Sequence, residues 1–126
     1  MKKNMILIIA ALVIVVLAFA FFKDKIIATA TPASDMDDFA KCLTAKGATF
    51  YGASWCGHCQ NQKKMFGDSI QYVNYIECAT PDGQGQTDAC KFAGITGYPT
   101  WDISGEKMSG AIPLEELSQK TGCKLA

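Results

Sequence analysis

The 126-residue sequence contains no arginine, so all twelve of its basic residues are lysines. From residue 26 onward, eight lysines stand against eleven Asp and Glu residues, which makes that part of the chain mildly acidic. Arginine supplies the planar, two-pronged donors with which proteins recognise phosphate groups and base edges. The composition therefore argues against a nucleic-acid-binding protein.

The sequence is also poor in metal ligands, with one histidine, His58, and one C-x-x-C pair, Cys56 and Cys59. A structural zinc site needs four ligands, which two such pairs commonly supply. We therefore expect no bound metal and no other cofactor. One alternative is a binding module in which Cys56, Cys59 and His58 hold Cu(I) or another soft metal, although only two sulfur ligands would converge there.

The longest apolar run extends from Met5 to Phe22 and carries no charged residue. As a helix it would be roughly 27 Å long, close to the hydrocarbon thickness of a bilayer. The lysines just before it place its N-terminus in the cytoplasm by the positive-inside rule. We therefore predict a single-pass anchor at residues 1–25. The alternative is a signal peptide cleaved after Ala30, because Ala28-Thr-Ala30 fits the A-x-A pattern.

Both interpretations place the rest of the chain in the periplasm or another extracytoplasmic space. The six cysteines agree with this independently, because disulfides persist in oxidising compartments. Residues 26–34 are rich in Ala, Thr and Pro and are predicted to be a linker. Residues 35–126 have the length of one domain.

Within that domain, the apolar periodicity and turn residues predict alternating helices and strands, which is an α/β pattern. Helices are expected at residues 35–45, 56–66, 89–93 and 113–121. Strands are expected at residues 48–53, 72–78, 100–103 and 106–109, with a loop at residues 79–87.

The segment Trp55-Cys56-Gly57-His58-Cys59 lies between an expected strand and helix. Free backbone N–H groups and the helix dipole at that position favour an anion, here the Cys56 thiolate. We therefore expect Cys56 to be the attacking thiol and Cys59, about one turn further on, the resolving thiol. Protonated His58 would favour the reduced form of the cysteine pair. The alternative is that His58 is a solvent-facing turn residue with little electrostatic effect. The alternative for the pair is a plain structural disulfide.

Residues 39–123 resemble a thioredoxin-fold domain, through Trp55–Cys59 and through Gly94-Ile-Thr-Gly-Tyr-Pro-Thr100, whose proline lies 43 residues after Cys56. With Tyr75-Ile-Glu-Cys78 and Pro81-Asp-Gly83, the chain is similar to the thioredoxin-like domains associated with bacterial vitamin K epoxide reductase homologues. The resemblance implies a central mixed sheet flanked by helices and thiol–disulfide exchange with protein substrates. It also implies a vitamin K epoxide reductase-like, quinone-linked membrane oxidase as partner.

The same resemblance implies that Pro99 is a cis-proline, which would expose the backbone of Tyr98 to an extended substrate. Trp55, Tyr98 and Gly97 would then contact the substrate, and Trp101 would belong either to this lip or to the core.

The chain departs from the family at Phe50, where many members carry a buried acid as proton acceptor for the resolving thiol. Water, His58 or another group must take that role here.

The remaining four cysteines allow three pairings. Cys78 and Cys90 bracket the expected loop, and their disulfide would contribute about 3 kcal/mol in the chain-entropy model. Cys42 and Cys123 would then join the first helix of the domain to the last. A second redox-active pair at Cys78 and Cys90 is the alternative.

The sequence thus predicts a membrane-anchored thiol–disulfide oxidoreductase that donates disulfides to proteins outside the cytoplasm. The alternative with the same chemistry is a reductase or isomerase, in which electrons flow the other way.

Overall fold

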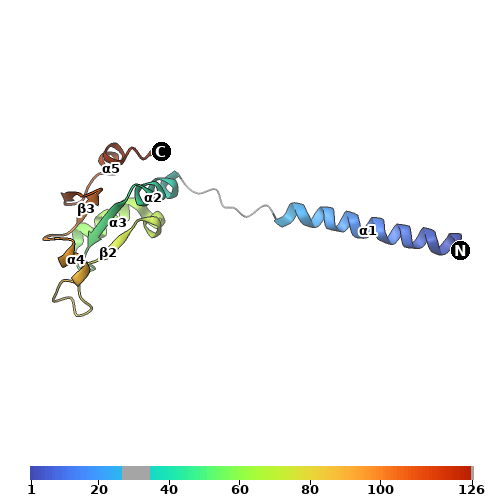
Figure 1. The fold of residues 1–126 in the computed structure, drawn as a ribbon, viewed down its shortest axis with the longest axis horizontal. Coiled ribbons are helices and arrows are strands. Elements are labelled where there is room, and N and C mark those ends of the chain that lie inside the picture. The colour runs from blue at the N-terminus through green and yellow to red at the C-terminus, as the bar shows by residue number, and fades with distance from the viewer. Residues whose placement is uncertain (27–34, 126) are drawn as a thin grey trace. The chain divides into compact units, whose positions relative to one another are not determined.

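A computed structural model of the chain describes the backbone of residues 1–26 and 35–125 (Figure 1). The chain divides into two compact units, Met1–Pro32 and Ala33–Ala126. Most of the expected linker, residues 27–34, lies outside the described residues.

The first unit is the helix α1, Lys2–Ile26, which contains the apolar run. Its side chains are described up to Ala18, and large apolar side chains are exposed along it, for example Leu7 and Ile14. Among the described residues, no helix has both the length and the apolar character that a bilayer span requires. The structure therefore supports a helix at residues 2–26 but not the predicted transmembrane helix.

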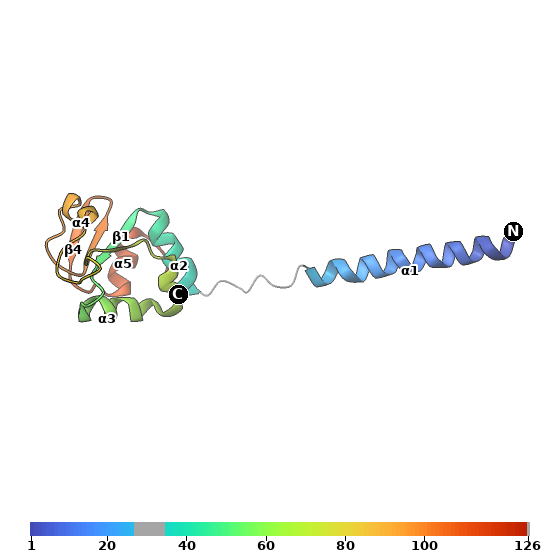
Figure 2. The same ribbon diagram turned by 90° about the horizontal axis from the view of Figure 1, so that it is seen from below.

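The second unit contains four helices, one 3₁₀ helix and four strands among its described residues (Figure 2). The helices are α2 (Asp35–Ala45), α3 (Gly57–Phe66), α4 (Asp88–Phe92) and α5 (Leu114–Thr121), and the 3₁₀ helix is η1 (Gly67–Tyr72). The strands are β1 (Ala48–Gly52), β2 (Tyr75–Glu77), β3 (Thr100–Ile103) and β4 (Glu106–Ser109).

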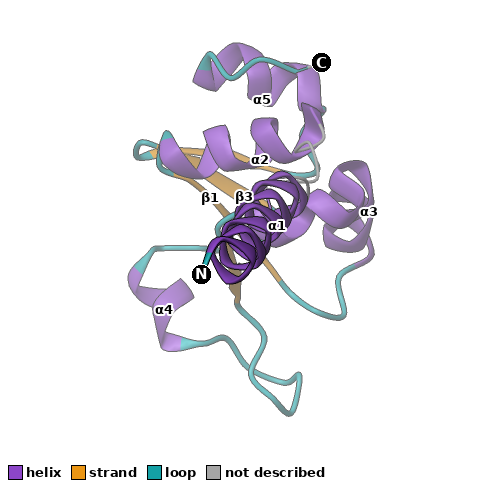
Figure 3. Cartoon of the chain, turned by 90° about the vertical axis from the view of Figure 1, so that its right-hand side faces the viewer, coloured by secondary structure: helices purple, strands orange, loops and turns teal. Residues whose placement is uncertain are grey.

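The strands form one sheet in the order β2-β1-β3-β4. Strand β1 pairs in parallel with β2, with Gly52 opposite Glu77, and antiparallel with β3. Strands β3 and β4 form an antiparallel hairpin. Figure 3 shows the helices of this unit arranged around the strands. The predicted α/β fold with a mixed central sheet flanked by helices is thus confirmed.

The second expected strand is shorter than predicted, because residues 67–72 form η1 and only residues 75–77 form β2. The turn is closed by the Val73 N–H, which donates to the Ile70 carbonyl at 3.0 Å. The Thr44 hydroxyl then bridges the turn to α2, since it donates to the Tyr72 carbonyl (2.7 Å) and accepts from the Asn74 N–H (3.0 Å). These bonds satisfy backbone groups that a longer strand would have paired.

The main core lies between the sheet and helices α2, α3 and α5. Phe50 of β1 is fully buried and stacks on Trp101 of β3, with ring centroids 5.0 Å apart. Phe39 and Leu117 are buried in the same core. Burial of each of these large side chains contributes roughly 2–3 kcal/mol, so this core holds the domain together. Trp101 therefore belongs to the core and not to the lip of the site.

Candidate active site

Cys56 is the N-cap residue of α3, directly after the loop that leaves β1. Its sulfur accepts a hydrogen bond from the Cys59 N–H at 3.3 Å and lies 3.7 Å from the Tyr98 carbonyl oxygen. An N–H donor at the positive end of a helix stabilises a thiolate more than a thiol. Cys56 is 7% exposed, whereas Cys59 is 0% exposed. Both cysteines are free thiols in this structure.

The Cys59 thiol is held in its protonated form. Burial, a hydrogen bond with the Cys56 side chain and the charge of that sulfur raise its pKa to about 12, although the Ala53 backbone and Lys63 act in the opposite direction. At neutral pH, Cys59 is therefore a thiol that needs a proton acceptor before it can act as a nucleophile.

The loop before β3 brings a second segment to Cys56. The Tyr98–Pro99 peptide bond is cis, and the Gly97 carbonyl accepts a hydrogen bond from the Thr100 hydroxyl at 2.9 Å. The Tyr98 ring packs edge-on against Trp55, with ring centroids 5.9 Å apart. Trp55 is 63% exposed, so the two rings form an apolar lip that solvent reaches.

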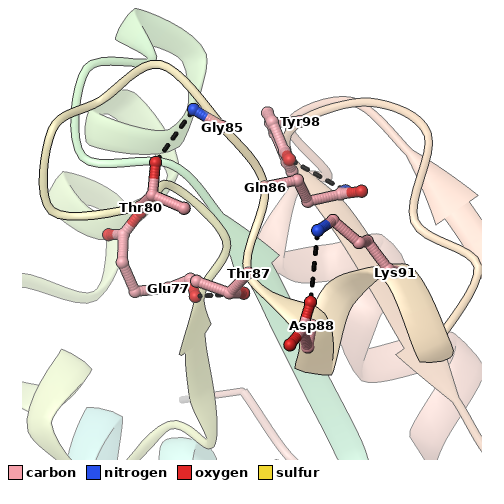
Figure 4. A network of polar contacts seen from close by, with 8 residues as sticks. All are labelled: Glu77, Thr80, Gly85, Gln86, Thr87, Asp88, Lys91 and Tyr98. Carbon is pink, nitrogen blue, oxygen red and sulfur yellow. Dashed lines mark hydrogen bonds and ion pairs between the residues drawn. The ribbon is translucent and has the colours of Figure 1, made fainter.

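The loop at residues 79–87 is attached to this lip (Figure 4). The Gln86 side-chain amide donates to the Tyr98 hydroxyl at 2.9 Å and to the Ile95 carbonyl at 2.7 Å. The Thr87 hydroxyl donates to the Glu77 carbonyl at 3.2 Å, which ties the end of the loop to β2. Gln86 is a site residue that the sequence analysis missed, because only the folded loop brings it to Tyr98.

The other four cysteines are paired as anticipated from the sequence. Cys78 and Cys90 form a disulfide across the base of the loop, and Cys42 and Cys123 join α2 to the segment after α5.

His58 is exposed on the first turn of α3. In the part of the chain that the structure describes, no group of three or more His, Cys, Asp or Glu side chains is arranged to hold a metal ion. The structure therefore offers no support for the soft-metal alternative.

A polar cluster that the sequence analysis missed adjoins the thiols: Tyr75 and Glu77 of β2 and Lys63 of α3. The Tyr75 hydroxyl donates to Glu77 Oε2 at 2.7 Å, and Glu77 Oε1 accepts the N–H groups of Ser54 (3.0 Å) and Ala79 (2.9 Å). The Lys63 ammonium lies 3.7 Å from the Tyr75 ring centroid. Tyr75 and Glu77 are two residues apart, so the sequence alone indicates that they share one face of a strand. Their register against Gly52 depends on strand pairing, which the sequence does not show.

Both members of the Tyr75–Glu77 pair have a defined charge at neutral pH. Burial disfavours the Glu77 carboxylate, but the hydrogen bonds from Tyr75, Ala79 and Ser54 outweigh it, so the pKa of Glu77 is lowered. Burial and the bond to Glu77 raise the pKa of Tyr75. The pair is therefore a neutral phenol bonded to a carboxylate.

Comparisons with known proteins agree with this geometry. The thioredoxin family model matches residues 34–121. A curated protein of Arabidopsis thaliana, thiol-disulfide oxidoreductase LTO1, is 41% identical over 110 residues, which are 83% of this chain and 28% of that protein. The chain thus spans little more than a quarter of the length of that relative.

Proposed function

The chain belongs to the thioredoxin family, and on this basis we propose that it is a thiol–disulfide oxidoreductase that acts on proteins through Cys56 and Cys59. The observation that carries the proposal is the asymmetry of the pair. Cys56 sits at the start of α3, where its sulfur accepts an N–H bond, and Cys59 is a buried thiol directly behind it. This is the arrangement that one attacking and one resolving sulfur require.

The proposed direction is disulfide donation. A substrate thiolate attacks Cys56 of the Cys56–Cys59 disulfide, and Cys59 leaves as a thiolate that takes up a proton. A second substrate thiolate then attacks the substrate sulfur of the mixed disulfide, which forms the substrate disulfide and releases the Cys56 thiolate. Two electrons pass from the substrate to the Cys56–Cys59 pair.

Two features support this direction. The helix N-terminus stabilises the Cys56 thiolate, which exists only in the reduced protein, and this makes the disulfide a stronger oxidant. His58, exposed on the same turn, would add to the effect when protonated.

The reduction potential of the full-length chain tests the direction. We expect a value above about −200 mV, as for strong disulfide donors. A value near that of thioredoxin, about −270 mV, would point to a reductase instead.

The proposed partner is a vitamin K epoxide reductase-like, quinone-linked membrane oxidase that restores the Cys56–Cys59 disulfide. The support is the resemblance stated above, carried by Tyr75–Cys78 and Pro81–Gly83. In Cys59→Ala, the mixed disulfide with Cys56 cannot be resolved and can be isolated. Recovery of a quinone-linked membrane protein in that adduct would support the proposal, and recovery of secreted proteins alone would refute this recycling route.

We further propose that the domain lies outside the cytoplasm and is held at a membrane by the apolar run of residues 5–22. The support is the sequence of that run, the lysines before it and the two disulfides of the domain. Attachment would raise the concentration of the domain near a membrane partner. Flotation of the chain with membranes, together with labelling of its thiols by an impermeant reagent in intact cells, tests both points. Thiols that react only after lysis would contradict the location.

A further inference from the structure

The buried Cys59 thiol has no acidic residue beneath it on β1. Phe50 of β1 belongs to the same buried core as Cys59, and its ring is enclosed between Trp101 (5.0 Å) and Tyr75 (5.1 Å between ring centroids). In the reduced protein, Cys59 hydrogen-bonds with Cys56. That acceptor is lost when Cys56 is bound in a mixed disulfide, so another acceptor is required at the resolving step.

The contacts around Gly52 show which polar side chain lies near the Cys59 sulfur. A Cβ atom on this glycine would lie 3.3 Å from the Cys59 sulfur, 3.2 Å from the Tyr75 hydroxyl oxygen and 2.9 Å from Tyr75 Cε2. The sulfur and the phenol oxygen therefore both approach the same side of Gly52, more closely than a side chain at residue 52 would allow. The hydrogen of this phenol is donated to Glu77, so the lone pairs of its oxygen remain available to accept a proton.

We propose that Tyr75 accepts the Cys59 proton and passes its own hydroxyl proton to Glu77, so that the Tyr75–Glu77 pair is the proton relay of the resolving thiol. This inference rests on the proposed thiol–disulfide exchange. The charged and titratable groups around the relay are Cys56 and Lys63 of the α3 segment, together with Glu77 itself.

The charges favour this route. Glu77 is ionised and only partly buried, so it can receive a proton and release it to water. Lys63 lies over the Tyr75 ring and stabilises negative charge on both Cys59 and Glu77. The relay thus connects a buried sulfur to the solvent through one phenol and one carboxylate.

In the resolving step, the Cys59 S–H proton moves to the Tyr75 oxygen while the Tyr75 proton moves to Glu77. The Cys59 thiolate attacks the Cys56 sulfur, the Cys56–Cys59 bond forms, and the bond from Cys56 to the partner sulfur breaks. The partner leaves as a thiolate with the electron pair, and Glu77 releases the proton to water. In the reverse direction, the same atoms return a proton to Cys59 when it leaves.

The test uses the reduced full-length chain and oxidised glutathione, with acid quenching and mass spectrometry. The first step, glutathionylation of Cys56, and the second, formation of the Cys56–Cys59 disulfide, are then measured separately. In Tyr75→Phe we expect the second step to slow about 10- to 100-fold at pH 7, because a positioned acid–base group contributes at least this much. The first step should change less than twofold.

Raising the pH supplies hydroxide as an alternative acceptor, so the defect of Tyr75→Phe should diminish steadily above pH 9. The matched control is Tyr72→Phe, since Tyr72 also lies under a lysine, with Lys41 at 4.3 Å from its ring centroid, but belongs to η1. Tyr72→Phe should leave both steps unchanged. Equal slowing of both steps in Tyr75→Phe, or a pH-independent defect, would indicate a structural role and overturn the relay.

Two further variants locate the path. Glu77→Gln keeps an oxygen for the N–H groups of Ser54 and Ala79 but cannot take up a proton, so it should slow the second step selectively. The exposed Glu106→Gln is its control. Gly52→Ala would bring a Cβ atom to 2.9 Å from Tyr75 Cε2, so the ring must move relative to the Cys59 sulfur, and the second step should slow while glutathionylation of Cys56 changes less than twofold. A normal second step in Glu77→Gln would overturn the relay. If the wild type forms neither product, the proposed function fails instead.

Discussion

The two disulfides of the domain lie in different surroundings. Cys42 and Cys123 are 81 residues apart in the sequence, and their bond adjoins the main core that contains Phe39 and Leu117. Cys78 and Cys90 are only 12 residues apart and are buried in a small cluster with Ile95. Tyr98, whose carbonyl adjoins the Cys56 sulfur, packs against both clusters, but only the Cys78–Cys90 bond closes the loop that bonds the Tyr98 hydroxyl.

This difference indicates that the two disulfides have different roles. The Cys42–Cys123 bond ties α2 to the segment after α5, whereas the Cys78–Cys90 bond fixes the base of the loop that carries Gln86. Because Gln86 donates to the Tyr98 hydroxyl, the position of the lip depends on that loop. The first disulfide should therefore act on stability, and the second on stability and exchange together.

The largest expected effect is the loss of the long-range disulfide. Cys42→Ser with Cys123→Ser should lower the free energy of unfolding by about 4 kcal/mol, because the bond closes a long loop in the unfolded chain. Urea denaturation measures this loss. The rate of exchange with a peptide disulfide, measured where the variant is fully folded, should stay within twofold of the wild type. A tenfold fall in that rate would break the distinction between the two bonds.

Removal of the short-range disulfide is the second prediction. Cys78→Ser with Cys90→Ser should cost about 3 kcal/mol of stability, since the closed loop is shorter. Here the exchange rate should also fall, by about tenfold, because the loop no longer holds Gln86 against Tyr98. The same urea and exchange assays apply. An unchanged exchange rate would show that the loop positions nothing that the reaction uses.

The third prediction concerns the free pair and uses pH. Folding raises the pKa of Cys59 from 9.0 to about 12, mainly through burial, so the folded state holds this proton more tightly than the unfolded state. The resulting stabilisation is complete below pH 9 and is lost as the pH rises through 12. At pH 10 the reduced chain should have lost about 1 kcal/mol relative to Cys59→Ala. Parallel stability profiles of the two proteins from pH 8 to 11 would contradict the burial of Cys59.

Much of this architecture could be predicted from local sequence. The hairpin of β3 and β4 follows from alternating residues around Ser104-Gly105, and α5 is delimited by Pro113 and Gly122, which adopts the left-handed conformation at its C-cap. The position of Cys56 follows in the same way from a β-rich segment next to a helix-forming one. In each case the signal lies within a few consecutive residues.

What could not be predicted depends on register and on loop closure. The relay needs Gly52 to lie opposite Glu77, and the parallel pairing of β1 with β2 sets that register across residues that are far apart in sequence. Gln86 offers no signal either, because a glutamine in a polar loop looks like a solvated side chain. Both omissions concern polar groups whose partners are brought together only by the fold.

The smallest expected effect isolates the contact between the loop and the lip while both disulfides stay intact. Gln86→Leu removes the donor to the Tyr98 hydroxyl and to the Ile95 carbonyl, so kcat/KM for a peptide substrate should fall about threefold, in line with the net worth of one hydrogen bond. Its control is Gln62→Leu, because the buried Gln62 amide bonds both the N–H and the carbonyl of Ile112 in the main core. That variant should lose about 2 kcal/mol of stability and keep its exchange rate. If Gln86→Leu is destabilised but exchanges normally, the loop is a structural brace and the lip does not depend on it.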